Sequence, residues 1–332
     1  MILTADILLH HEYAETSSVW RKQRLLNYFT PPDRGMELNI KAEEIPFDLD
    51  YTLECGQVFR WKRHGDWWYS TADEQAFKVR QMDGKIKFEG IDYPCFNHYF
   101  RLEDDLEEIT KAIAHDSFIA RAIKAFSGLR LVRQNPWECL ISFICATWKG
   151  VKAVDDMLSR LAHTFGRKIR FDGLTFYTFP QPDVLANANL RDLRSCGLGF
   201  RAPRVLETAR RISNGILDLE RLKKGEYEEG RDELLQLPGV GRKVADCILL
   251  FSLEKLEAFP IDVWMKRTVQ TRYLHWFDQS FINKLVKRES VSPTQYERIS
   301  ASARGYFGEY AGYAQEYLYH YARKGNLLDS TN

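Results

Sequence analysis

A lysine follows a glycine-rich turn and opens an apolar run with helical spacing. In LPGVGRKVADC, residues 237–247, Lys243 stands two residues after the second of two glycines, Gly239 and Gly241. The first turn of a helix disfavours a positive charge, and a dry cleft would lower the pKa of the amine further. A neutral amine is a nucleophile that attacks a sugar anomeric carbon and forms a Schiff base. The structural alternative for Lys243 is a solvated side chain or a phosphate contact.

Asp262 opens the next predicted helix, two residues after Pro260 in AFPIDVWMKRTV. Aspartate is a favoured N-cap, so its role can be wholly structural. A capping aspartate in a cleft is also rigid and ionised, and it would stabilise a sugar cation and polarise a lysine amine. The hairpin, the lysine and the Pro-x-Asp element at this spacing are together far more specific than any one of them.

The two glycines between the predicted helices suit contact with a phosphate backbone. Gly239 and Gly241 permit a tight turn with positive φ and a close approach of the backbone to a ligand. The first N–H groups of the following helix have no partner within it, and with the helix dipole they form an anion site. Such a turn would hold DNA without reading its sequence. A purely structural turn is about as compatible with these residues.

Composition sets the broad class of the chain. Its 332 residues are 45% hydrophobic and 28% charged, which is typical of a globular protein with a sizeable core. No apolar run approaches the roughly 18 residues of a membrane span, and the N-terminus lacks a signal-peptide pattern. We therefore expect an intracellular protein. The net charge is only +1, so any DNA-binding surface must be a local basic face.

The cysteine pattern argues against a metal centre. The six cysteines are scattered and form no Cys-x-x-Cys pair. This argues against a zinc ribbon and against an iron–sulfur loop, and it favours free thiols in a reducing compartment.

Strand signals fill the region from Phe47 to about Gly90. FDLDYTL alternates apolar and polar residues, and a His-Gly-Asp turn at 64–66 separates two aromatic runs. Asp83-Gly84 separates two alternating runs, which is a strong hairpin signal. We expect a small antiparallel sheet here.

Helical periodicity dominates from about Asp104 onward. Residues 136–166 predict two helices, or one broken at Gly150, and residues 182–212 and 231–253 each predict a helix, a glycine turn and a second helix. The fold class is therefore α+β, mainly α, with a β-rich subdomain at 36–100 and a helical body of two subdomains at 101–332. The helix–hairpin–helix lies at about 230–252. Residues 1–35 are an extension of uncertain status, because Met36 is an alternative start.

These motifs resemble a known family, the 8-oxoguanine DNA glycosylase/AP lyases of the helix–hairpin–helix glycosylase superfamily. The resemblance is carried by LPGVGRKVADC with FPIDVWMKR, and it runs from about Met36 to the end of the chain. Four further segments match: LECGQVFRWKR (53–63), RQNPWECLISFICAT (133–147), GLGFRAPRV (197–205) and AGYAQEYLYHY (311–321).

The resemblance implies roles for particular residues. Lys243 is the nucleophile and Asp262 its electrostatic partner, and both need a nucleotide flipped out of the duplex. The base pocket consists of the carbonyl of Gly56, which would accept the N7 hydrogen that guanine lacks, and of Gln315 on the Watson–Crick edge. Tyr319 and Cys247 would sandwich the ring. The alternatives are structural: a strand bulge for Gly56, a surface amide for Gln315, and core positions for the other two.

The resemblance also implies the DNA contacts. Phe200 is the wedge and Arg201 contacts the base opposite the lesion, although Phe200 is also compatible with a simple turn contact. The hairpin would hold phosphates, and its carbonyls are candidate ligands of a structural monovalent cation; its residues are Gly239, Val240, Gly241 and Arg242. We expect no metal or organic cofactor in the chemistry.

Four positions depart from the family pattern. Trp148 and Lys149 replace an asparagine run, and Ala153 stands where an arginine reads the opposing cytosine. We therefore expect a relaxed preference for the opposite base, with Trp148 filling the gap left by the flipped nucleotide. Trp264 stands where some relatives carry a histidine, and it is a further expected DNA contact of unassigned role.

Two other functions stay open at this stage. One is a monofunctional alkylpurine glycosylase on the same fold, which would use the aspartate without a lysine. The other is a noncatalytic helix–hairpin–helix DNA-binding protein. The expected partner is double-stranded DNA containing an oxidised purine, bound by a monomer with no membrane association, in the cytoplasm or nucleoid if the source is bacterial or archaeal.

Overall fold

A computed structural model describes residues 36–39, 45–72, 74–287 and 290–325, with the side chains described from residue 45 onward. The segment 1–35 and the question of its status lie outside these residues. No described helix is both long enough and apolar enough to cross a membrane.

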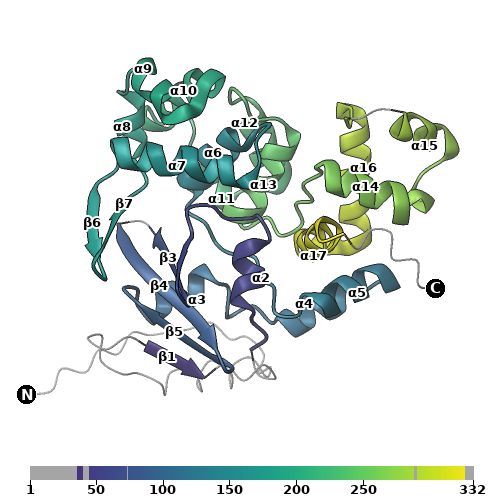
Figure 1. Ribbon diagram of the computed structural model, residues 1–332. Coiled ribbons are helices and arrows are strands. Elements are labelled where there is room, and N and C mark those ends of the chain that lie inside the picture. Colours follow the sequence, from purple (N-terminus) through teal and green to yellow (C-terminus); the bar gives the residue numbers. More distant parts are fainter. Residues whose placement is uncertain (1–35, 40–44, 73, 288–289, 326–332) are drawn as a thin grey trace, which may run out of the picture.

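A five-stranded antiparallel sheet forms the N-terminal part (Figure 1). Tight turns of two residues join its neighbouring strands at Gly65-Asp66 and Asp83-Gly84, and Asp83 and Gly84 both have positive φ, as expected for this hairpin type. The predicted sheet and both hairpins are confirmed. In spatial order the strands are β1 (Met36–Asn39), β5 (Lys85–Glu89), β4 (Gln75–Met82), β3 (Trp67–Ala72) and β2 (Lys62–His64).

The predicted strand at FDLDYTL is wrong, because this segment forms helix α2 (Leu49–Glu54). The Asp48 carboxylate accepts a hydrogen bond from the Tyr51 N–H at 2.8 Å and caps the helix. Leu49 and Leu53, one turn apart, are both buried. The cap and this spacing outweigh the short alternation. Helix α3 (Tyr93–Tyr99) covers the sheet, and Phe96 stacks on Phe88 with ring centroids 4.0 Å apart.

A second, two-stranded sheet was not predicted. Strands β6 (Lys168–Phe171) and β7 (Leu174–Tyr177) flank Asp172-Gly173, the same turn signal as in the main sheet. Asp172 accepts hydrogen bonds from Tyr69 and Lys78, so this hairpin is tied to the main sheet.

The helices form two groups (Figure 1). The first follows the chain from α6 (Pro136–Ala146) and α7 (Val151–Phe165) to α8 (Pro182–Ala186), α9 (Leu190–Leu193), α10 (Ala202–Ser213), α11 (Leu219–Lys224), α12 (Tyr227–Leu235) and α13 (Arg242–Ser252). The second group packs around α17 (Ala311–Arg323) and holds α4 (Leu106–Ile113), α5 (Ser117–Ala125), α14 (Val263–Arg272), α15 (Gln279–Val286) and α16 (Pro293–Phe307).

The predicted α+β, mainly α fold with two helical groups is confirmed. The proposed boundary near residue 100 falls between α3 and α4, although α4 and α5 pack against the C-terminal helix α17. The chain therefore passes from the sheet into the second helical group before it builds the first. Helix α13 belongs to the first group and the start of α14 to the second, so the predicted site lies where the two groups meet.

Candidate active site and DNA-binding face

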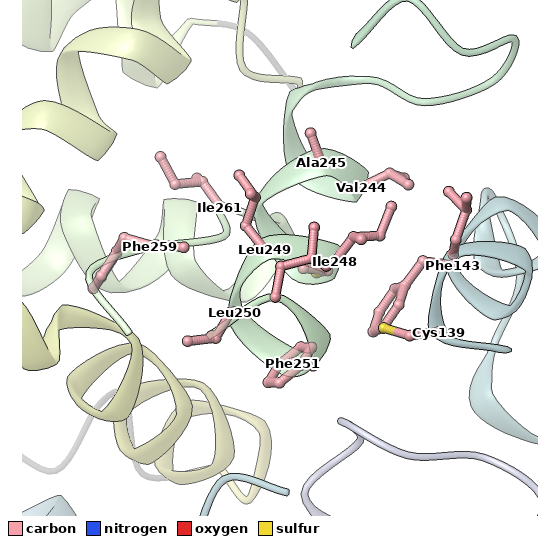
Figure 2. Close-up of a cluster of buried hydrophobic side chains, with 14 of the residues drawn as sticks. Cys139, Phe143, Val244, Ala245, Ile248, Leu249, Leu250, Phe251, Phe259 and Ile261 are labelled. Carbon is pink, nitrogen blue, oxygen red and sulfur yellow. The ribbon is translucent and has the colours of Figure 1, made fainter. Parts of the chain in front are cut away.

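Helix α13 is the central support of the site. The sequence predicts one buried stripe on this helix, but every residue from Val244 to Ser252 is buried. Figure 2 shows why: Phe143 and Cys139 of α6 lie on one side of α13, and Phe259 and Ile261 lie on the other. The helix is thus enclosed by both helical groups, and its first turn has a fixed position.

Lys243 lies half-buried in that first turn. Its Nζ is 4.9 Å from the ring centroid of Phe143, and it forms a side-chain hydrogen bond with Cys247, one turn along the helix. Burial lowers the pKa of Lys243, but interactions with Cys247 and Asp262 outweigh it, so its pKa lies above the ordinary lysine value. The expected lowered pKa is therefore wrong for this structure, because Cys247 and Asp262 both favour the ammonium form.

Asp262 is the N-cap of α14, as predicted. Its carboxylate accepts a hydrogen bond from the Met265 N–H at 2.9 Å. Burial raises the pKa of Asp262, while the Met265 N–H and the charge of Lys243 lower it. The capping role and the electrostatic role are thus held by the same carboxylate. The structure brings Lys243 and Asp262 together across the junction of the two helical groups.

The hairpin before α13 forms around one glycine with positive φ. Gly239 has φ +90°, and the Val240 N–H donates to the Leu237 carbonyl at 3.2 Å. Gly241 has φ −97°, which any residue adopts, so Gly239 is the one of the two glycines that uses a positive φ. The Val240 side chain is buried, so any contact of this residue with DNA would come from its backbone.

Arg242 has an acidic partner inside the protein. Its guanidinium pairs with Glu297 of α16, which also binds Arg231 of α12. Arg231 in turn pairs with Asp246, a buried residue of α13 that accepts hydrogen bonds from the hydroxyls of Tyr227 and Tyr296. This network of ion pairs connects the end of the hairpin to α12 and α16. The sequence signal that could have revealed it is the single acid inside the apolar run of α13.

The predicted base-pocket residues lie close to one another. Gly56 has φ +106°, and a Cβ added to it would lie 3.5 Å from the hydroxyl of Tyr319 on α17. Gln315, one turn before Tyr319, and Cys247 on α13 are buried. Burial raises the pKa of the Cys247 thiol to about 12, while Lys243 lowers it. The thiol is therefore an uncharged lining of the pocket. Three separate segments thus meet beside Lys243.

Comparisons with known proteins identify the family to which this arrangement belongs. The family model for the N-terminal domain of 8-oxoguanine DNA glycosylase matches residues 37–140, and the helix–hairpin–helix motif matches residues 223–251. A protein of Methanothermobacter thermautotrophicus named probable N-glycosylase/DNA lyase is 34% identical over 70% of this chain and 75% of its own length. The chain belongs to the 8-oxoguanine DNA glycosylase family.

Two further relatives agree with this assignment. The N-glycosylase/DNA lyase of Arabidopsis thaliana is 29% identical over 90% of this chain and 82% of its own length. The 8-oxoguanine glycosylase/lyase of Clostridium acetobutylicum, solved with double-stranded DNA containing cytosine opposite 8-oxoguanine, is 30% identical. That structure has a TM-score of 0.76 and covers 89% of this chain and 99% of its own.

Two predicted DNA contacts of this family member are exposed aromatic rings. Trp148 is 88% exposed and has φ +60°, an unusual value for a residue with a side chain. Phe200 is 55% exposed at the turn between α9 and α10. Lys149 is also exposed. Large exposed rings are suited to insert between bases or to stack on them.

Arg201 lies differently from the expectation. It is only 2% exposed, because its guanidinium donates to the Thr147 carbonyl and lies 4.3 Å from the Phe200 ring centroid. As placed here, it does not present its donors to an opposite base. Trp264 is half-buried, and its ring packs on the guanidinium of Arg267 at 5.0 Å, so its role stays unassigned.

Two polar side chains near the site were missed at the sequence level. Glu316 directly follows Gln315 in α17 and is buried, and Arg204 lies beside the hairpin. Within the described part of the chain, no three His, Cys, Asp or Glu side chains gather closely enough to hold a metal ion.

Proposed function

We propose that the chain is a bifunctional enzyme that removes 8-oxoguanine from duplex DNA and then cleaves the strand as a lyase. The observation that carries this proposal is the Lys243–Asp262 pair, which lies beside the base pocket and directly behind a phosphate-binding type of hairpin. The relatives support the same activity, because two are named N-glycosylase/DNA lyase and a third is an 8-oxoguanine glycosylase/lyase.

The reaction begins with extrusion of the damaged nucleotide, because neither group reaches a sugar carbon inside a stacked duplex. Lys243 is held as an ammonium, so it must lose a proton before it attacks. Asp262 is the carboxylate whose charge acts on Lys243, and we assign it as the acceptor. A carboxyl that burial makes more basic suits this transfer.

The neutral amine then attacks the sugar C1′. A bond forms between Nζ and C1′, the C1′–N9 bond breaks, and its electron pair leaves with the base, which takes up a proton. Opening of the sugar ring gives a Schiff base. Loss of a C2′ proton and of the 3′ phosphate by β-elimination nicks the strand 3′ to the lesion. These steps use the amine, a carboxylate and the base, so we assign them no cofactor.

Recognition of the base is assigned to the pocket around Gly56. Its carbonyl would accept the N7 hydrogen of 8-oxoguanine, whereas guanine would place two acceptors face to face. Gln315 would bind the Watson–Crick edge, with Tyr319 and Cys247 on the two ring faces. The burial of Gln315 and Cys247 supports these roles, as does the position of Tyr319, whose hydroxyl would lie 3.5 Å from a Cβ added to Gly56.

The hairpin and the exposed rings are assigned to duplex DNA. The N–H groups of Gly239, Gly241 and Arg242 would hold phosphate, and the hairpin carbonyls would take a monovalent cation. Arg242 would exchange its contact with Glu297 for a phosphate. We propose that the protein acts as a monomer, in the compartment that contains the DNA.

We further propose that the preference for the opposite base is relaxed. Ala153 provides no guanidinium, and Arg201 is directed to the Thr147 carbonyl. Trp148 would fill the gap left by the flipped nucleotide by stacking, which tolerates any sequence.

Trapping with borohydride on a duplex that contains one 8-oxoguanine tests the function. A covalent protein–DNA band for the wild type, and none for Lys243→Gln, is the expected result. Base release without a band would indicate a monofunctional glycosylase, as in the alkylpurine alternative. Neither band nor release would mean that the substrate is another lesion, or that the chain only binds DNA.

A further inference from the structure

Two neighbouring side chains of α17 each hold an oxygen with no hydrogen-bond partner. Gln315 is 5% exposed and Glu316 is 2% exposed, and the Oε1 atoms of both lack a partner among the residues that the structure describes. Buried polar atoms are nearly always satisfied in native proteins, so such an atom needs an explanation. For Gln315 the explanation is its proposed hydrogen bond to the Watson–Crick edge of the base. Glu316 has none so far.

Glu316 contacts the loop that carries the proposed lesion-reading carbonyl. Its carboxyl forms a side-chain hydrogen bond with the thiol of Cys55, which is fully buried. Cys55 directly precedes Gly56. The same loop touches α17 again at Tyr319 and Arg323, since a Cβ on Gly56 would lie 3.5 Å and 3.0 Å from their side chains. Glu316 therefore lies at the level of the base pocket.

The charge of Glu316 acts on the other pocket residues. Burial raises the pKa of Cys247 and of Tyr319, the two proposed faces of the base site, and the charge of Glu316 adds to both shifts. Asp262 and Lys243 in turn influence the pKa of Glu316. Residues from α13, the start of α14, α17 and the Gly56 loop thus surround one carboxyl.

No cation among the described residues forms an ion pair with this carboxyl. In the described part of the chain Glu316 has no ion pair, and Arg323, two turns along α17, donates instead to the Glu54 carbonyl and to Tyr319. Burial raises the pKa of Glu316 to about 7, with Cys55 and Arg323 lowering it. An unpaired, deeply buried carboxyl is costly to the fold, and its presence beside a proposed site indicates a ligand-directed role.

We propose that Glu316 is a specificity-determining residue whose free Oε1 accepts an N–H of the flipped purine, beside the Gly56 carbonyl. This inference rests on the proposed function. The oxygens of Gly56, Gln315 and Glu316 make the pocket rich in acceptors. Such a pocket matches 8-oxoguanine, which carries N–H groups at N1, N2 and N7. Guanine is matched less well, because its N7 is itself an acceptor.

The test compares two substrates for each variant. Single-turnover release of 8-oxoguanine reports base recognition, and borohydride trapping on the same duplex with an abasic site reports Lys243 without a base to read. Trapping also counts active molecules, so the ratio of the two rates is insensitive to partial misfolding. Glu316→Met keeps the length of the side chain and removes the acceptor. Glu316→Gln keeps one oxygen.

The ratio should fall by roughly tenfold to a hundredfold for Glu316→Met, the loss expected for one buried hydrogen bond to a base. It should fall much less for Glu316→Gln. Glu309→Ala, which changes an exposed acid just before α17, should leave the ratio unchanged.

Three results would overturn the proposal. An unchanged ratio for Glu316→Met would show that the base does not use this oxygen. Equal loss for the methionine and glutamine variants would assign the role to charge rather than to the acceptor. Loss of trapping on the abasic duplex would show that Glu316 supports the reactivity of Lys243 or the folding of the protein, and not recognition of the base. A wild type that releases no 8-oxoguanine, yet is trapped on abasic DNA, would instead refute the proposed function.

Discussion

The guanidinium of Arg201 donates a hydrogen bond to the backbone carbonyl of Thr147, the residue directly before Trp148. The polar group expected to read the opposite base is thus held against the protein, and the neighbouring Trp148 ring is exposed. On the proposed binding face, a surface for stacking takes the place of a hydrogen-bonding group. This arrangement explains why a relaxed preference for the opposite base is expected.

Restoring an arginine on α7 should restore a preference. Ala153→Arg places a guanidinium in the first turn of that helix, where the family pattern has one. A good contact to a base is worth about 1–3 kcal/mol, so excision opposite C should gain roughly tenfold over excision opposite A. Single-turnover rates opposite C, T, G and A measure this. Lys152→Arg, an exposed neighbour, is the control. A wild type that already strongly prefers C would contradict the premise.

Arg204 connects the wedge loop with the hairpin. Its Cδ lies 2.5 Å from where a Cβ on Gly239 would be, and its guanidinium lies 5.1 Å from the Phe200 ring centroid. It forms no ion pair with a described residue. A guanidinium in this place is suited to bind a phosphate next to the lesion.

Arg204→Gln should therefore weaken DNA binding about equally for all sequences. The slope of log K against log salt should become shallower by about 1, the value for one lost phosphate contact. Fluorescence anisotropy at several salt concentrations measures the slope. Arg210→Gln removes an exposed arginine of the same helix that donates to the Ala186 carbonyl, and it should leave the slope unchanged. Equal slopes for wild type and Arg204→Gln would show that Arg204 does not contact a phosphate.

The two roles of Asp262 can be separated by substitution. Asparagine also caps helices well, so Asp262→Asn should preserve stability while it removes the charge that acts on Lys243. Asp262→Ala loses both and should cost about 1 kcal/mol of unfolding free energy. Trapping rates should fall roughly a hundredfold or more in both variants. Urea unfolding and trapping together decide this, and a near-normal rate for Asp262→Asn would leave Asp262 a structural cap only.

Local signals predicted those parts of the fold that local contacts determine. Asp83-Gly84 specified a hairpin because its positive φ angles suit few other residues, and Asp262 was readable as an N-cap. Residues 47–53 were mistaken for a strand, since a short alternation also fits a capped helix turn. The Asp172-Gly173 hairpin carried the same signal as Asp83-Gly84 and was overlooked.

The charge environment of the site could not be read from spacing. A lowered pKa for Lys243 followed from the helix dipole and burial alone, but the direction of the shift also depends on the interactions of the amine with Cys247 and Asp262. Arg201 matched its motif, yet its orientation depends on the Thr147 carbonyl, which is distant in sequence. Motifs identify which residues meet, and the packing of α6, α13 and α17 determines their protonation and exposure.

Buried His320 should make the fold sensitive to mild acid. It is 1% exposed, its ring lies 4.2 Å from that of Phe126, and its Nδ1 has no partner among the described residues. Burial, with the charges of Arg323 and Lys324, lowers the pKa of His320 to about 4. The unfolded chain binds this proton near pH 6.5, so protonation favours unfolding.

Above about pH 6.5 His320 is neutral in both states and does not lower the unfolding free energy. As the pH falls towards 4, protonation in the unfolded chain lowers the unfolding free energy by up to about 3 kcal/mol. His320→Gln removes this titration, so its unfolding free energy relative to wild type should rise by that order between pH 7 and pH 4. Urea unfolding across this range measures the difference. Exposed His275→Gln is the matched control. Parallel pH curves for wild type and His320→Gln would show that His320 is protonated equally well in the folded state.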